Sequence, residues 1–137
     1  MPGRTLAIDP GERRVGLAVS DPTGIIAQGL DTFDRRLDGD LIAHLNRLAR
    51  EYDVAHIIVG NPMSLSGREG EASALARRLA DEVREGVGLP VELWDERLSS
   101  AEAHRVLAGS RAGKKAVDRV AAALILQNYL DAHPRAS

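Results

Sequence analysis

The chain of 137 residues contains no cysteine and only two lysines, and aromatic residues make up just 3% of it. The lack of cysteine excludes disulfides, thiolate metal ligands and cysteine nucleophiles. The scarcity of aromatic side chains argues against a broad surface for stacking nucleobases. No apolar run approaches the length of a membrane span, and the N-terminus does not resemble a signal peptide. We therefore expect a cytoplasmic protein with no membrane partner.

The remaining composition is that of an ordinary globular protein, with 44% hydrophobic residues, 28% charged residues and a formal net charge of −2. The length suits a single domain over residues 1–137. Charge is unevenly spread, because Lys114 and Lys115 lie in a glycine-containing stretch between Arg105 and Arg119 that holds five basic residues and one acid. We expect a mobile basic loop there, which is either simply solvated or holds a phosphate backbone.

Apolar periodicity and turn residues predict alternating strands and helices along the whole chain. The predicted strands are residues 6–9, 15–20, 25–33, 56–59 and 91–94, and the predicted helices are residues 41–52, 72–83, a short one from Ser99 and a long one from about Val117 to Leu130. This βββαβαβαα order predicts an α/β fold with a mixed five-stranded sheet and helices on both faces.

Acidic residues stand at three of the predicted boundaries between elements: Asp9, the pair Asp95 and Glu96, and Asp118. Each alone suits a turn or a helix N-cap. Sites in such sheets gather at the carboxyl ends of parallel strands, so these acids can also converge on Mg²⁺ or Mn²⁺ for phosphodiester chemistry. Strand alternation puts Asp95 and Glu96 on opposite faces, which leaves open the one that faces the cluster.

Four motifs in this order resemble the YqgF/RuvX family over nearly the whole chain. They are Ile8-Asp9-Pro10-Gly11 with Arg14, Gly16, Ala18, Ser20 and Asp21; Gly60-Asn61-Pro62 with Gly67 and Gly70; Asp95 to Ser100; and Asp118 with Ala121, Ala122, Leu126, Gln127, Tyr129 and Leu130. That family is described as Holliday junction resolvases or as pre-16S rRNA nucleases, with a ribonuclease H-like fold. Asp21 is also explained as a turn residue, and we expect Trp94 to pack within its strand.

The resemblance implies a divalent-metal-dependent nuclease whose catalytic and metal-binding acids are Asp9, Glu96 and Asp118. Two Mg²⁺ or Mn²⁺ ions are implied, with the substrate phosphate completing their coordination. The implied substrate is structured nucleic acid, either the 5′ end of the 16S rRNA precursor or a Holliday junction. Candidates for phosphate contact, each of which also suits an ordinary surface charge, are Arg14, Arg68, Arg97, Lys114 and Lys115.

Two other classes of protein remain open on the sequence. The first is a non-catalytic nucleic-acid-binding or ribosome-associated module that keeps the fold. The second is an ATP-binding domain of the actin and sugar-kinase type, because Asp9-Pro10-Gly11 after a strand also resembles that superfamily's first phosphate loop. Such proteins close two domains over the nucleotide, and this chain supplies one. RNA or DNA substrate, endonuclease or exonuclease action, and monomer or homodimer are left open.

Overall fold

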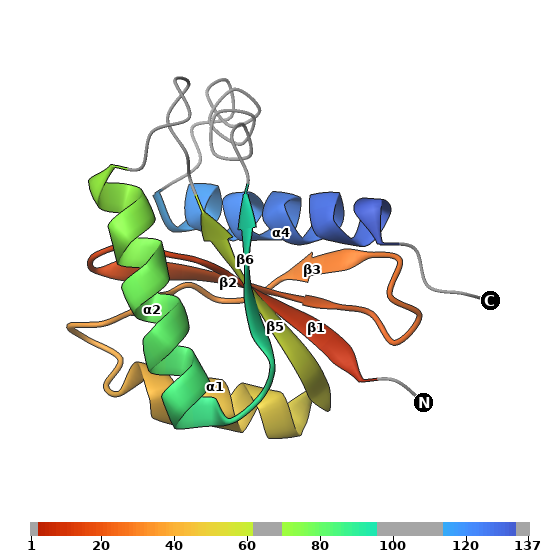
Figure 1. The fold of residues 1–137 in the computed structure, drawn as a ribbon, viewed down its shortest axis with the longest axis horizontal. Coiled ribbons are helices and arrows are strands. Elements are labelled where there is room, and N and C mark those ends of the chain that lie inside the picture. Colours follow the sequence, from red (N-terminus) through yellow and green to blue (C-terminus); the bar gives the residue numbers. More distant parts are fainter. Residues whose placement is uncertain (1–2, 62–69, 96–113, 134–137) are drawn as a thin grey trace.

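The computed structural model describes residues 3–61, 70–95 and 114–133, which form three layers (Figure 1). Its strands are β1 (Arg4–Asp9), β2 (Arg14–Ser20), β3 (Ala27–Gly29), β4 (Phe33–Asp34), β5 (Val54–Asn61) and β6 (Val91–Asp95), and its helices are α1 (Leu41–Glu51), α2 (Glu71–Val87) and α4 (Lys114–Ala132). The sheet order is β3-β2-β1-β5-β6, with β4 paired to β2. The three strands β1, β5 and β6 are parallel, whereas β2 runs antiparallel to its neighbours. The predicted mixed α/β sheet is confirmed.

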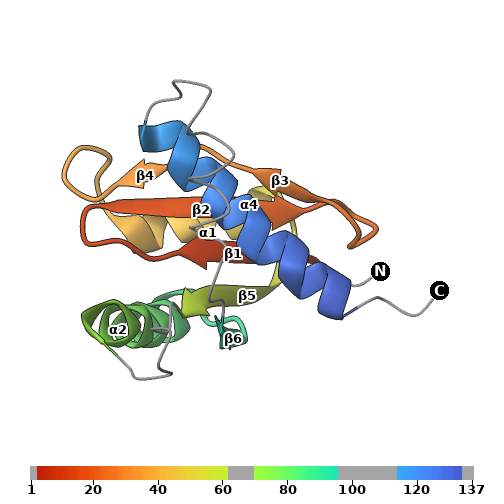
Figure 2. The same ribbon diagram turned by 90° about the horizontal axis from the view of Figure 1, so that it is seen from above.

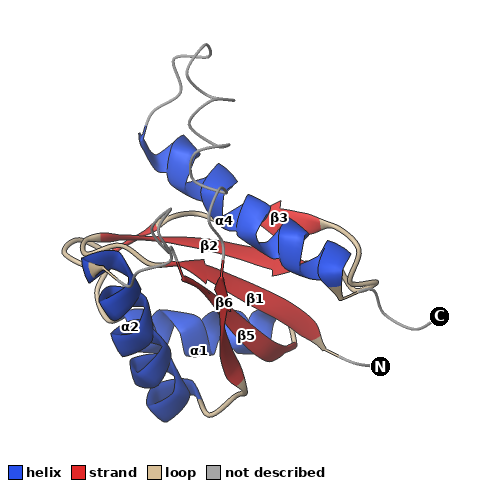
Figure 3. Cartoon of the chain, turned by 45° about the horizontal axis from the view of Figure 1, so that its top comes forward, coloured by secondary structure: helices blue, strands red, loops and turns tan. Residues whose placement is uncertain are grey.

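Alternation along β1 divides the core into two parts on opposite faces of the sheet. Leu6 and Ile8 belong to the larger cluster beneath α1 and α2, whereas Ala7 belongs to the cluster beneath α4. Figure 3 shows α1 and α2 on one side of the sheet and α4 on the other. The two faces are called the α2 face and the α4 face below.

Helix α1 forms where the predicted amphipathic stripe begins. Asp40 is its N-cap, and the carboxylate accepts a hydrogen bond from the Ile42 N–H at 3.1 Å. The buried stripe of Leu41, Leu45 and Leu48 packs on the α2 face of the sheet. Helix α2 ends at Gly88, whose φ of 77° lies in the left-handed region that glycine adopts without strain.

The α4 face of the sheet carries small residues that let a helix approach closely. Ala7 and Ala18 meet Ala122 there in the buried cluster. A Cβ atom added to Gly60 would lie only 2.7 Å from the Cδ1 atom of Ile125 on α4. The small side chains therefore fix the depth at which α4 crosses the strands, a crossing that Figure 2 shows from above.

The predicted third strand, residues 25–33, is wrong as a single element. It is divided into β3 and β4, which pair with opposite ends of β2. Two residues of β2 separate Val15 from Ala18, whereas three residues separate their partners, Phe33 and Gly29. The extra residue makes a β-bulge, which shifts the register and interrupts the ladder.

Two other boundaries differ from the prediction. The strand expected to end at Val59 continues as β5 through Gly60 and Asn61, because Trp94 and Asp95 of β6 pair with both residues. The last helix begins at Lys114 rather than near Val117. The short helix predicted from Ser99 lies outside the described residues.

Candidate active site

Parallel pairing brings the carboxyl ends of three strands to one edge of the sheet, called the catalytic edge below. Ile8 of β1 pairs with Val59 of β5, so Asp9 lies beside the end of β5. Asn61, at that end, pairs in turn with Asp95 of β6. Adjacent strands are about 4.8 Å apart, so the carboxyl ends of β1, β5 and β6 lie close together. This is the position where sites form in open α/β sheets.

The β1–β2 turn places Arg14 near Asp9 on the α4 face. Asp9 pairs with Gly16 across the antiparallel ladder, and alternation puts Arg14 and Gly16 on the same side as Asp9. The turn is tight, because a Cβ atom on Gly11 would lie 2.2 Å from the carbonyl oxygen of Arg14. The bulge opposite β2 lies beside the same Gly16. Bulges are common next to active sites because they redirect side chains.

Asp95 lies on the opposite face, where a short hydrogen-bond chain holds it. The Ser73 hydroxyl of α2 donates to Oδ1 of Asn61 at 2.5 Å, and Nδ2 of Asn61 donates to Oδ1 of Asp95 at 2.9 Å. Ser73 is fully buried and Asn61 is 5% exposed. Both polar groups of the Asn61 amide are therefore satisfied. The Asp95 carboxylate is on the α2 face, away from the face that carries Asp9.

Helix α4 runs back across the strands toward the catalytic edge. Tyr129 packs against His56 near the start of β5, with ring centroids 5.6 Å apart, and Ile125 lies over Gly60 near the end of the same strand. The helix therefore runs antiparallel to β5, and its first turns lie at the catalytic edge (Figure 2). Asp118 precedes Ile125 by seven residues, about two turns, so it lies in the part of α4 nearest that edge.

This placement changes the interpretation of two sequence features. Asp118 is the fifth residue of α4, so it is not the N-cap residue that the predicted boundary allowed. Lys114 and Lys115 form the start of the helix, so their prediction as loop residues is wrong. Lysine and alanine both favour helix formation, which suits Lys114, Lys115 and Ala116 to the first turn of α4.

Three of the predicted site residues, Glu96, Arg68 and Arg97, lie outside the described residues. Within the described part, no group of three or more histidine and acidic side chains is positioned to hold a metal ion. No helix in that part is long and apolar enough to cross a membrane.

Asp21 is confirmed as a turn residue. Its Oδ1 accepts hydrogen bonds from the backbone N–H groups of Ile25 and Ile26 at 2.9 and 3.0 Å, and its Oδ2 accepts from the Thr23 hydroxyl. The Thr23 bond and these backbone bonds lower the pKa of Asp21 to about 2. Trp94 is also confirmed as a packing residue, since its ring meets Tyr129 edge-on at 5.3 Å.

Sequence reasoning missed the Ser73–Asn61–Asp95 chain. Asn61 follows a glycine and precedes a proline, which is the composition of a turn. A polar residue that directly follows an apolar strand is the only sequence signal for it. Ser73 carries no signal at all, because a serine in the first turn of a helix is ordinary.

The fold is ribonuclease H-like. The chain aligns with T. thermophilus RuvC, solved in complex with a Holliday junction substrate, with a TM-score of 0.56 over 96% of each chain. Their sequences are 15% identical, so this likeness concerns the fold. The ribonuclease H-like architecture expected from the motifs is therefore confirmed.

The family follows from sequence. A family model described as "RuvX: Holliday junction resolvase" matches residues 3–132. A Dictyoglomus thermophilum relative is 43% identical over 132 residues, covering 93% of this chain and 95% of the relative. A Koribacter versatilis relative is 45% identical over 133 residues, covering 94% and 87%. Both are named "Putative pre-16S rRNA nuclease". The chain belongs to the RuvX family.

Proposed function

We propose that this chain is a divalent-metal-dependent nuclease that works as a single domain over residues 1–137. Asp9, Glu96 and Asp118 bind the metal ions and are its catalytic residues. Arg14, Arg68, Arg97, Lys114 and Lys115 contact the phosphate backbone of the substrate. Membership of the RuvX family and the ribonuclease H-like fold support the reaction class.

One observation supports the choice of acids. Asp9 and the first turns of α4 lie at the same edge and on the same face of the sheet. Asp95 is on the other face, bound to the Asn61 amide. In an extended chain the next residue belongs to the opposite face, which favours Glu96 over Asp95 as the ligand from β6.

The donor set fits a hard cation. Three carboxylates offer oxygen ligands only, and the chain has no cysteine, so Mg²⁺ or Mn²⁺ fits better than a thiolate-bound metal. Two such ions supply an activated water and stabilise the leaving 3′-oxygen. Three carboxylates cannot neutralise two dications, so the substrate phosphate completes the coordination. We expect metal and substrate to bind cooperatively.

The names of the relatives and of the family support two candidate substrates. Both are named for the 16S rRNA precursor, so processing of its 5′ end in the cytoplasm is the first candidate. The family description favours a Holliday junction as the second. Both substrates present the same phosphodiester to the acids. Cutting a junction symmetrically needs two active sites and hence a homodimer, whereas trimming an rRNA end needs one chain.

The test is cleavage of three labelled probes in parallel: a 16S rRNA precursor fragment, a four-way DNA junction and single-stranded DNA. Each is incubated with Mg²⁺, with Mn²⁺ and with excess EDTA. We expect cleavage of the rRNA fragment with either metal and none in EDTA. Cleavage of the junction alone selects the second substrate. Cleavage that persists in EDTA rules out the metal mechanism, and binding without cleavage of any probe identifies a non-catalytic module.

A further inference from the structure

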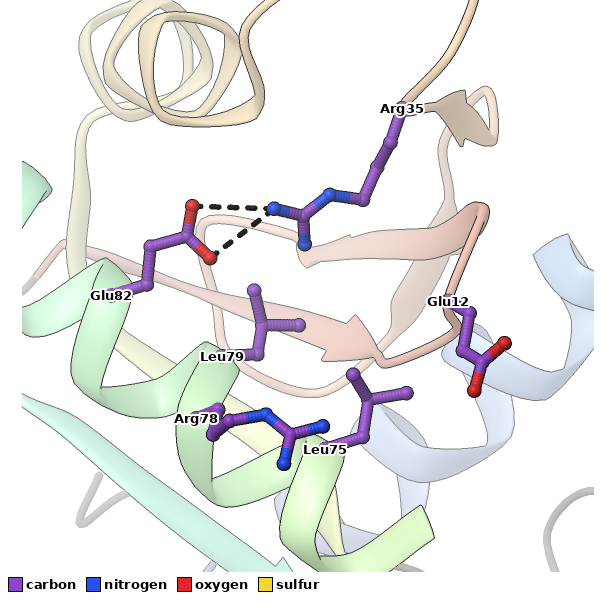
Figure 4. A pocket seen from close by; sticks show the side chains of 6 residues that line it. All are labelled: Glu12, Arg35, Leu75, Arg78, Leu79 and Glu82. Carbon is purple, nitrogen blue, oxygen red and sulfur yellow. Dashed lines mark hydrogen bonds and ion pairs between the residues drawn. The ribbon is translucent and has the colours of Figure 1, made fainter. Parts of the chain in front are cut away.

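A cavity of about 550 Å³ lies on the α2 face beside the catalytic edge (Figure 4). Its volume is within the range of small-ligand sites. Three parts of the chain form it: the β1–β2 turn, the residue after β4, and α2. The lining residues are Glu12, Arg35, Leu75, Arg78, Leu79 and Glu82.

The floor is apolar and the rim is charged. Leu75 is half-buried and supplies the exposed apolar surface of the floor, and Leu79, which is 2% exposed, lies beneath it. Figure 4 shows the guanidinium groups of Arg35 and Arg78 on either side of Leu79, with the Glu12 carboxylate beyond Leu75. Such a surface suits a flat ring that carries charge or polar groups at its edge.

The two arginines differ in how they are held. Nη2 of Arg35 bonds both carboxylate oxygens of Glu82 at 3.3 Å, which holds the guanidinium group at the rim of the cavity. Its Nε and Nη1 groups have no hydrogen-bond partner among the described residues. Arg78 is exposed and makes no ion pair within that part of the chain. Arg35 is thus a planar group paired at the rim, and Arg78 is a cation available to an anionic ligand.

The charges around the cavity balance, so the pairing of each group decides which ligand charge is favoured. Arg13 pairs with Asp34 at 3.0 Å, and Arg35 pairs with Glu82 at 3.3 Å. Four arginines and four acids lie in this corner: Arg13, Arg35, Arg36 and Arg78 with Glu12, Asp34, Asp38 and Glu82. Among the lining residues, Arg78 is the cation that no described ion pair neutralises, and it favours an anionic group on the ligand.

The cavity is also close to the proposed reaction centre. Glu12 follows Asp9 by three residues, which span at most about 11 Å of extended chain. Asp9 faces the α4 side and the cavity is on the α2 face, so a strand with its scissile phosphate at Asp9 reaches the cavity by passing around the β1–β2 turn, which carries Glu12.

We infer that this cavity binds one unpaired nucleotide of the substrate strand next to the scissile phosphate. The base packs on Leu75, over the buried Leu79, and against the Arg35 guanidinium group, and Arg78 binds the phosphate of that nucleotide. The Glu12 carboxylate accepts a hydrogen bond from an exocyclic amine of the base. This inference rests on the proposed nuclease function, because it takes the occupant from the substrate.

The direct test is NMR of the leucine methyl groups in EDTA, so that nothing is cleaved. AMP, adenosine and inorganic phosphate are titrated separately, and the shifts of the Leu75 and Leu79 methyl groups are followed. We expect saturable shifts with AMP, weaker binding of adenosine and no methyl shifts with phosphate. Arg78→Ala should weaken AMP about tenfold, the effect of one charge-assisted hydrogen bond, and leave adenosine unchanged. The control Arg50→Ala removes the same charge in the last turn of α1, and it should change neither the affinity for AMP nor that for adenosine.

A six-nucleotide oligoadenylate RNA links the cavity to the substrate. It should shift the same two methyl groups, and Arg78→Ala should weaken its binding. Two results would overturn the inference: AMP leaves these methyl groups unmoved, or phosphate alone reproduces its effect. A response to AMP but not to the oligonucleotide also overturns it, and identifies a free-nucleotide site instead. Metal-dependent cleavage without any shift of the Leu75 and Leu79 methyl groups refutes this inference alone. Nucleotide binding in the cavity without metal-dependent cleavage refutes the nuclease function alone.

Discussion

The Asn61 amide holds the Asp95 carboxylate on the α2 face of the sheet, with Nδ2 of Asn61 2.9 Å from Oδ1 of Asp95. This bond places Asp95 on the face opposite Asp9, which supports our choice between two adjacent acids that the sequence could not separate. It gives Asp95 a structural role at the junction of β5, β6 and α2. The metal-binding role then passes to Glu96 in our proposal.

The two acids should therefore respond differently to the same change. Asp95→Asn keeps an oxygen that accepts the bond from Asn61, so we expect cleavage within a few-fold of the wild-type rate. Glu96→Gln removes a charged metal ligand and should lower the rate by orders of magnitude. Single-turnover cleavage of one RNA probe by both variants measures this. The assignment is reversed if Asp95→Asn is the inactive variant.

The contact between Gly60 and Ile125 sets the position of α4. Gly60→Ala places a Cβ atom 2.7 Å from the Ile125 Cδ1 atom, and we expect it to destabilise the fold by about 1 kcal/mol, because only the end of a side chain must move. Ile125→Val removes that methyl group, so adding it to Gly60→Ala should restore part of the loss. Urea unfolding of the two single variants and the double variant gives the coupling energy. Strict additivity would mean that the two side chains do not interact.

Much of this architecture could be predicted because burial has a clear period. Ile57, Ile58 and Val59 form a continuous apolar run typical of a strand covered on both faces, and Leu41, Leu45 and Leu48 form a helical stripe. The bulge beside Gly16 could not be predicted, since one extra residue in a strand leaves hydrophobicity unchanged. The end of β5 could not be predicted either, because Asn61 stands between a glycine and a proline, as turn residues do. Pairing with Asp95 keeps Asn61 in the strand.

Asp21 makes the stability of the β2–β3 hairpin depend on pH. The fold lowers its pKa from 3.8 to about 2. As the pH falls, Asp21 is therefore protonated at a higher pH in the unfolded chain than in the folded chain. The stabilisation is therefore complete above about pH 4 and is lost as the pH falls toward 2. We expect the melting temperatures of wild type and Asp21→Ala to differ at pH 7 and to converge over that interval. A difference that stays constant from pH 5 to pH 2 would show that the carboxylate charge contributes nothing.

Lys114 and Lys115 allow a test of the basic surface without disturbing the fold. Alanine is a better helix former, and cations near a helix N-terminus oppose the helix dipole, so replacing both lysines should not lower the stability of α4. Binding of labelled RNA in EDTA should weaken, and the slope of log K against log salt should fall by up to about one unit per lost phosphate contact. An unchanged affinity and slope would leave both lysines as ordinary surface charges.

The most direct test of the nuclease proposal is the cleavage rate of Asp118→Asn with Mn²⁺, measured on a sample whose melting temperature is also recorded. Asp118 is the fifth residue of α4 and does not cap it, so helix capping cannot explain an effect of this change. Asparagine has nearly the same shape and lacks the charge of a metal ligand. We predict an unchanged melting temperature and a rate lower by orders of magnitude. A near-normal rate would contradict the account, because it would remove from the active site the one acid that α4 brings to the catalytic edge.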